Sequence, residues 1–148
     1  MRLKLMTLGI TIAVVAIMLA VSAPWAPGAG MRRVLLTPGP DGTGAKGEAT
    51  IIDKDASTRE IIVAAEGLKP TATYTVWVVN MKPKMDMAGV GTGDYAFKSD
   101  ATGRGQFIGT FPAADLAKWQ ILEVTHHPDG DPKNMKSMKV VLKGQLNP

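Results

Sequence analysis

The sequence predicts an all-β protein, an antiparallel β-sandwich of seven to eight strands, and three observations lead to that prediction. Short runs of β-branched and aromatic residues recur along the chain and are separated by turn-forming residues. No crossover helices of the kind that a parallel sheet needs lie between these runs. Residues 73–80, Thr-Tyr-Thr-Val-Trp-Val-Val-Asn, carry bulky side chains at both alternating sets of positions, so this strand is expected to be covered on both faces.

The chain of 148 residues starts with an apolar segment. Two basic residues precede residues 5–21, which carry no charge and are almost wholly apolar. Such a segment is an export signal or a hydrophobic helix that anchors the protein in a membrane. A small-residue cleavage site ends at Ala23, but Pro24 directly after it is expected to hinder the peptidase. We therefore expect residues 1–23 to be a signal peptide or a membrane anchor. The protein is expected to be exported to the periplasm or the extracellular space. If the segment stays uncleaved, it would hold the protein at the inner membrane.

The strands are expected in two parts of the chain. Residues 24–46 are rich in Pro and Gly and are expected to form a linker with one short strand at 32–36. The β-sandwich domain is expected over residues 47–148. Its predicted strands are 48–53, 59–66, 73–80, 95–99, 106–111, 120–126 and 138–146.

The connections follow from turn chemistry. Residues 54–58 have hairpin length, and a second hairpin is expected to join the strands on either side of residues 100–105. Residues 81–94 contain a proline and glycines at alternate positions, so we expect a long exposed loop without regular structure. Residues 112–119 are expected to form one or two helical turns that bring Trp119 against the edge of the sandwich.

One spacing indicates a particular kind of sandwich. Leu68, Pro70 and Tyr74 have the spacing of a tyrosine corner, in which the tyrosine hydroxyl bonds to main chain a few residues upstream. Trp77, on the same strand, is predicted to be buried. Together with short strands and regular turn signals, this spacing predicts immunoglobulin-like architecture.

Residues 47–146 resemble two groups of exported proteins. The segment Gly67-Leu68-x-Pro70-x-x-x-Tyr74-x-x-Trp77, followed by a glycine-rich loop, Asp100-x-x-Gly103 and Trp119, resembles the extracytoplasmic domain of anti-sigma-K-type factors. Its tyrosine-corner part also resembles fibronectin type III modules. The carboxy-terminal half, with His126-His127-Pro128-Asp129-Gly130-Asp131-Pro132, is similar to small exported bacterial proteins of unassigned function. The resemblance implies a fold rather than an activity. Regulation of a sigma factor is not expected, because those factors place a sigma-binding domain before the membrane segment and only four residues precede Leu5 here.

Composition excludes several classes of function. The chain has no cysteine, which excludes a disulfide framework, thiolate metal sites and a lipidated cysteine. Of its 17 basic residues two precede the apolar segment, so the remainder carries 15 basic against 13 acidic residues. That excess is too small to indicate nucleic-acid binding.

Methionine and histidine suggest one candidate site. Five of the six methionines after the apolar segment fall in two loops, and the only two histidines begin the second loop. Thioether sulfur suits Cu(I) and imidazole suits Cu(II), so the pattern is compatible with a copper site. The candidate ligands are His126, His127, Met81, Met85, Met87, Met135 and Met138. Lysines lie among both methionine groups and would repel a cation. The alternative to a copper site is that the methionines cover the ends of the sandwich and that the histidines end a strand.

No pattern of residues indicates catalysis. Asp129, Asp131 and Asn134 offer oxygen ligands, but the ligand order of a calcium loop is absent and turn chemistry explains them. No serine has the context of a nucleophile elbow. We expect a non-catalytic binding or structural module without a cofactor, which binds an unknown protein or surface partner. The alternative is a periplasmic copper-binding protein; a hydrolase or carbohydrate-active domain is disfavoured by the lack of carboxylate pairs and aromatic platforms.

Overall fold

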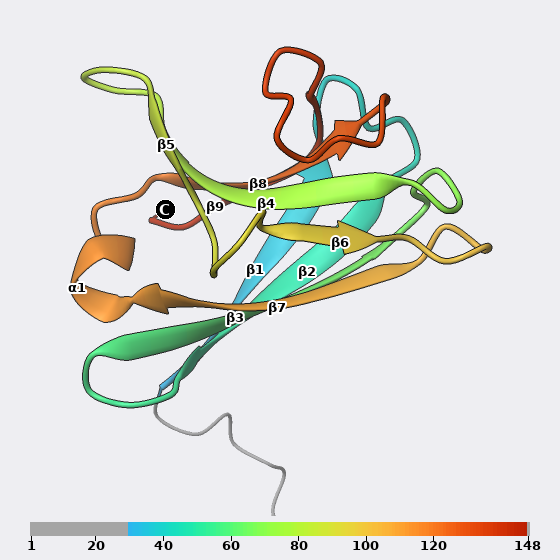
Figure 1. The fold of residues 1–148 in the computed structure, drawn as a ribbon. Coiled ribbons are helices and arrows are strands. Elements are labelled where there is room, and N and C mark those ends of the chain that lie inside the picture. Colours follow the sequence, from blue (N-terminus) through green and yellow to red (C-terminus); the bar gives the residue numbers. More distant parts are fainter. Residues whose placement is uncertain (1–29, 148) are drawn as a thin grey trace, which may run out of the picture.

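The computed structural model describes residues 30–147, in which nearly all regular structure is antiparallel β-sheet (Figure 1). This confirms the predicted all-β antiparallel class. The predicted amino-terminal segment lies outside the described residues, and none of the helices in 30–147 is long and apolar enough to cross a membrane. The elements are β1 (Met31–Pro38), β2 (Lys46–Asp53), β3 (Thr58–Glu66), β4 (Thr73–Asn80), β5 (Asp86–Gly89), β6 (Ala96–Lys98), β7 (Gly105–Pro112), α1 (Ala113–Leu116), β8 (Ile121–His127) and β9 (Lys139–Gln145).

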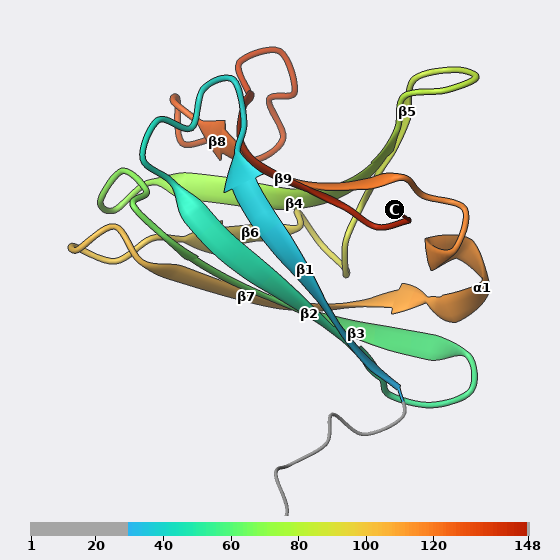
Figure 2. The same cartoon turned by 180° about the vertical axis from the view of Figure 1, so that it is seen from behind.

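The strands form one curled sheet in the order β5-β4-β8-β9-β1-β2-β3-β7, and β6 pairs with the first residues of β4 (Figures 1 and 2). β1 forms the corner, because it pairs with β2 over Met31 to Leu36 and with β9 over Thr37 and Pro38. At the other side, β6 packs against β7, and the backbone N–H of Gly91 donates to the carbonyl of Thr110 at 3.1 Å. The two ends of the sheet are thus brought together, which covers an edge that would otherwise be open to another strand.

The short strand that was predicted at 32–36 within the linker is present as β1 over Met31–Pro38, and residues 39–45 connect it to β2. Val34, Leu36 and Ala45 are buried in the hydrophobic core, and the ladder with β2 starts at Met31. The ordered sheet therefore begins well before residue 47.

Two predictions about connections are wrong. Residues 81–94 contain β5, whose residues Asp86 to Gly89 pair with the second half of β4. The strands around residues 100–105 do not form a hairpin, since β6 pairs with β4 and β7 pairs with β3. The Phe97 ring of β6 packs closely against Gly105 of β7, since a Cβ built on Gly105 would lie 2.5 Å from the ring.

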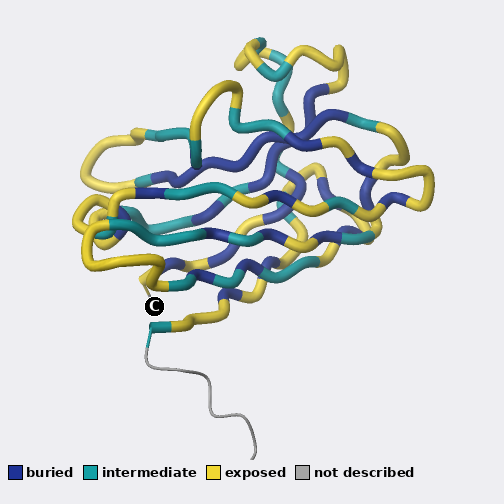
Figure 3. Tube along the Cα trace, turned by 60° about the horizontal axis from the view of Figure 1, so that its bottom comes forward, coloured by how far each residue is buried: buried dark blue, intermediate teal, exposed yellow. Residues whose placement is uncertain are grey.

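β4 is the most buried strand of the sheet, with seven of its eight residues buried. Tyr74, Val76 and Val78 face the core that also receives side chains from β1, β2, β3, β7, β8 and β9. Trp77 lies on the opposite side, edge-on to Tyr95 with ring centroids 5.2 Å apart. The prediction that both faces of this strand are covered, and that Trp77 is buried, is confirmed. In Figure 3 the buried segments lie mainly along the strands and the exposed segments mainly in the connections.

The tyrosine corner is confirmed. The hydroxyl of Tyr74 accepts a hydrogen bond of 2.9 Å from the backbone N–H of Lys69. The ring stacks on Phe97 with centroids 5.5 Å apart. Gly67, which starts this corner, has a φ of 70°, and a Cβ there would lie 2.3 Å from the carbonyl oxygen of Gly44. The approach to β4 therefore requires glycine at this position.

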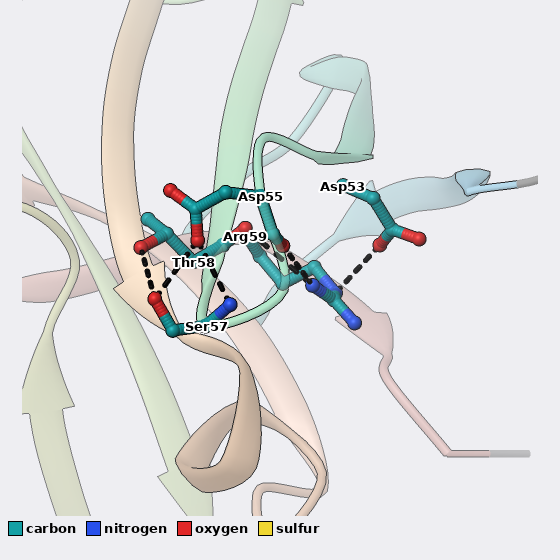
Figure 4. Close-up of polar contacts among 5 residues, drawn as sticks. All are labelled: Asp53, Asp55, Ser57, Thr58 and Arg59. Carbon is teal, nitrogen blue, oxygen red and sulfur yellow. Dashed lines mark hydrogen bonds and ion pairs between the residues drawn. The ribbon is translucent and has the colours of Figure 1, made fainter.

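The hairpin between β2 and β3 is held by its own side chains (Figure 4). Asp55 Oδ1 accepts hydrogen bonds of 2.8 Å from both the backbone N–H and the hydroxyl of Ser57. These bonds lower the pKa of Asp55. Arg59 Nε lies 2.6 Å from Asp53 Oδ1 across the hairpin. The predicted turn at 54–58 and the antiparallel pairing of its two strands are confirmed.

Replacing Tyr74 by Phe should lower the free energy of unfolding by about 0.5–1.5 kcal/mol, because it deletes one buried hydrogen bond and keeps the ring. Urea denaturation monitored by circular dichroism measures the change. Tyr95→Phe is the matched control, since the Tyr95 hydroxyl makes no hydrogen bond within residues 30–147. Equal losses in the two variants would contradict the role given to the corner.

Candidate functional site

The register of β4 separates the first methionine group from the histidines. Thr73 pairs with His127 at one end of β4, and Val79 pairs with Met87 near the other end. Six residues of strand span about 20 Å. Figure 1 shows the segments that follow β4 and β8 at opposite ends of β4. Metal ligands must converge within a few ångströms, so Met81, Met85 and Met87 do not share one metal with His127.

The two histidines are also separated from each other. Successive residues of β8 point to opposite faces, and His126 lies against the ring of Tyr74 on the core side with centroids 5.2 Å apart. His127 points the other way and contacts Thr75. Met135 and Met138 follow β8 at the same end as both histidines, and copper binding by this smaller set stays a prediction. Within residues 30–147 there is no group of three His, Asp or Glu residues that could hold a metal ion.

His127 belongs to a buried polar network centred on the hydroxyl of Thr75. Thr75 Oγ1 accepts a 2.7 Å hydrogen bond from Trp77 Nε1 and lies 2.8 Å from His127 Nε2 and 2.7 Å from Thr125 Oγ1. A hydroxyl has one proton and two lone pairs. After accepting from Trp77, it donates to one of its other two partners and accepts from the other.

The second nitrogen of His127 has no hydrogen-bond partner in the described part of the chain, although the residue is only 1% exposed. A proton on Nδ1 would leave a buried N–H unpaired, whereas a proton on Nε2 donates to Thr75 and leaves Nδ1 with a lone pair. In proteins, a buried N–H without an acceptor is rarer than a buried lone pair without a donor. The geometry therefore favours the tautomer with the proton on Nε2.

The loop after β8 is stabilised by one carboxylate. Asp129 Oδ2 accepts hydrogen bonds from Asn134 Nδ2 at 2.6 Å and from the hydroxyl of Ser137 at 3.1 Å. Its other oxygen accepts from the backbone N–H of Asp131 at 3.1 Å. These donors lower the pKa of Asp129. Protein groups thus already bind this carboxylate, in agreement with the interpretation of the loop as turn chemistry.

A second feature, not identified from the sequence, is the side of β1, β2, β3 and β7 that is turned away from the core, which we call the outer face. Leu35 is 72% exposed and Ile108 is 60% exposed on this face. Ile62 pairs with Ile108, whereas Ile52 pairs with Met31 and Glu60; both isoleucines are half-buried. The register aligns the outward-pointing side chains across the four strands. They are Met31, Arg33, Leu35, Lys46, Glu48, Thr50, Ile52, Glu60, Ile62, Ala64, Glu66, Gln106, Ile108 and Thr110.

A groove of about 910 Å³ lies over one end of the outer face and is bordered by charges of both signs. Leu35 and Ala64 supply apolar lining. Lys46 Nζ lies 2.8 Å from Glu66 Oε1, and Arg33 Nε lies 3.6 Å from Glu48 Oε1. The Glu66 partner raises the pKa of Lys46. Exposed ion pairs of this kind add little stability, so their relevance lies in the charge pattern that they give the face.

The sequence does carry a signal for the outer face. All four strands contain adjacent bulky apolar residues, namely Val34-Leu35-Leu36, Ile51-Ile52, Ile61-Ile62 and Phe107-Ile108. In a strand one member of each pair must point away from the core. Ile51, Ile61 and Phe107 are the buried members, which leaves their neighbours on the outer face.

Comparison of the sequence with models of known protein families and with curated proteins finds no match.

Replacing Thr75 by Val should lower the free energy of unfolding by roughly 2–4 kcal/mol, because Trp77 Nε1 and His127 Nε2 would lose their shared partner inside the protein. Thr125→Val is the matched control: it is equally buried but breaks a single hydrogen bond of the network, so about 0.5–1.5 kcal/mol is expected. Guanidinium denaturation of both variants measures the difference. If Thr125→Val costs as much as Thr75→Val, the hydroxyl of Thr75 is not the centre of the network.

Proposed function

We propose that this chain is an exported, non-catalytic module of the immunoglobulin-like β-sandwich type, and that it associates with a second copy of itself through the outer face. The observation that carries the proposal is the group of apolar side chains exposed there, with Leu35 and Ile108 the most exposed. A rigid sheet supports them, because each strand of the face is paired along its length. A surface of this kind is more typical of an interaction site than of a free face.

The assignment to an exported sandwich rests on separate observations. The β4–β8–β9 part of the curled sheet faces the β2–β3–β7 part across the core, and the tyrosine corner supports an immunoglobulin-like arrangement (Figure 2). The uncharged segment 5–21, preceded by basic residues, supports export.

The charge pattern favours a second copy as the partner. The outer face carries Arg33 beside Glu48 and Lys46 beside Glu66. A two-fold contact pairs one patch with the same patch on the other subunit. Because each cation lies next to an anion on the face, a two-fold axis through the face can bring opposite charges together. A mixture of apolar and polar side chains is also the usual composition of a protein interface.

Cross-linking of the whole chain tests this proposal directly, since the protein has no cysteine of its own. A single Leu35→Cys variant treated with a short bifunctional thiol reagent should give a covalent dimer. Lys84→Cys, at an exposed position in the segment that follows β4, is the control and should stay monomeric. Equal cross-linking of both variants, or none in either, would contradict association through the outer face.

Charge substitutions supply the second half of the test. Leu35→Glu and Ile108→Glu should each weaken self-association at least tenfold, because burying an unpaired carboxylate within the contact is unfavourable. Met85→Glu is the matched control, as Met85 is 66% exposed and lies outside the outer face. Sedimentation of the full chain over a concentration series gives the dissociation constants. Unchanged association in Leu35→Glu would overturn the proposal.

A further inference from the structure

A small pocket of about 250 Å³ lies beside the tyrosine corner, away from the outer face. It is bounded by the connection between β1 and β2, by the residues that precede β4, and by the adjoining ends of β8 and β9. Its lining combines apolar and charged side chains. These are Ala45, Leu68, Tyr74 and Val141 on the apolar side, and Asp41, Lys69, His126 and Lys139 on the polar side.

The imidazole of His126 lines this pocket and has unused hydrogen-bonding capacity. The residue is only 6% exposed, yet its ring nitrogens make no hydrogen bond within residues 30–147. The Tyr74 hydroxyl beside it is already bonded to the Lys69 backbone. In the described part of the chain the one buried side-chain nitrogen without a partner is His127 Nδ1, so the ring nitrogens of His126 reach solvent and are accessible to a ligand in the pocket.

The charges around the pocket favour an anion. Lys69 and Lys139 both line it, and Asp41 is the one acidic residue among the lining side chains. The pKa of His126 is lowered by burial first and then by the charges of Lys69, His127 and Lys139. Two lysines against one aspartate leave an excess of positive charge around the pocket.

We infer that this pocket binds a small organic carboxylate. Its carboxylate group would lie against Lys69, Lys139 and the free nitrogen of His126, and its short apolar part would contact Ala45, Leu68 and Val141. Apolar walls with a few convergent polar groups are the usual composition of a ligand site. The pocket is smaller than a drug-sized site, so it suits a molecule with few carbons. This inference does not depend on the proposed association.

Titration of the whole chain with benzoate, followed by NMR of the histidine rings and by calorimetry, tests the inference. We expect saturable binding that shifts the His126 ring resonances and leaves those of His127 unchanged, because His127 points to the opposite side of β8. Benzyl alcohol, which has the same ring and no charge, should bind at least tenfold more weakly. Lys69→Gln and Lys139→Gln should each weaken benzoate binding at least fivefold.

Lys143→Gln is the matched control, because Lys143 is an exposed lysine of β9 that does not line the pocket. Its affinity for benzoate should equal that of the unaltered chain. Three results would overturn the inference: benzyl alcohol binding as tightly as benzoate, benzoate binding that is unaffected by Lys69→Gln, or no saturable binding. Inorganic phosphate binding as tightly as benzoate would instead assign the pocket to inorganic oxyanions, and would overturn the carboxylate assignment.

Discussion

The burial of both faces of β4 is the constraint on which the rest of this structure depends. One face supplies Tyr74, Val76 and Val78 to the core, and the other holds Thr75 and Trp77 in the polar network with His127. A strand covered on both sides cannot shift by one residue, because every side chain would then exchange its environment. The register of β4 with β5, β6 and β8 is fixed for the same reason.

That register determines what each candidate site can do. It places the first methionine group and the histidines at opposite ends of one strand, and it turns His126 and His127 to opposite sides of β8. Two adjacent residues of the same type therefore have different roles. His127 completes a buried network whose centre is the Thr75 hydroxyl, whereas His126 lines a pocket beside two lysines.

The sequence was sufficient to predict what depends on local pattern. Alternation identified β4, and a fixed spacing predicted that the Tyr74 hydroxyl bonds to main chain a few residues upstream, where the structure shows the N–H of Lys69 as the donor. It was insufficient where partners are distant along the chain. β5 and β6 both pair with the edge of β4 that β8 leaves free, and local pattern does not identify that partner. The outer face was missed because a pair such as Ile61-Ile62 does not show which member points inward.

Both faces of β4 are covered within one molecule, whereas we propose that the outer face is covered only by association. Methyl NMR with a soluble paramagnetic probe, recorded on the whole chain at low and high protein concentration, tests both parts at once. The methyl groups of Val76 and Val78 should be shielded at every concentration, and those of Leu35 and Ile108 should be accessible in dilute protein and protected in concentrated protein. Accessibility of Leu35 and Ile108 that does not change with concentration would contradict this account.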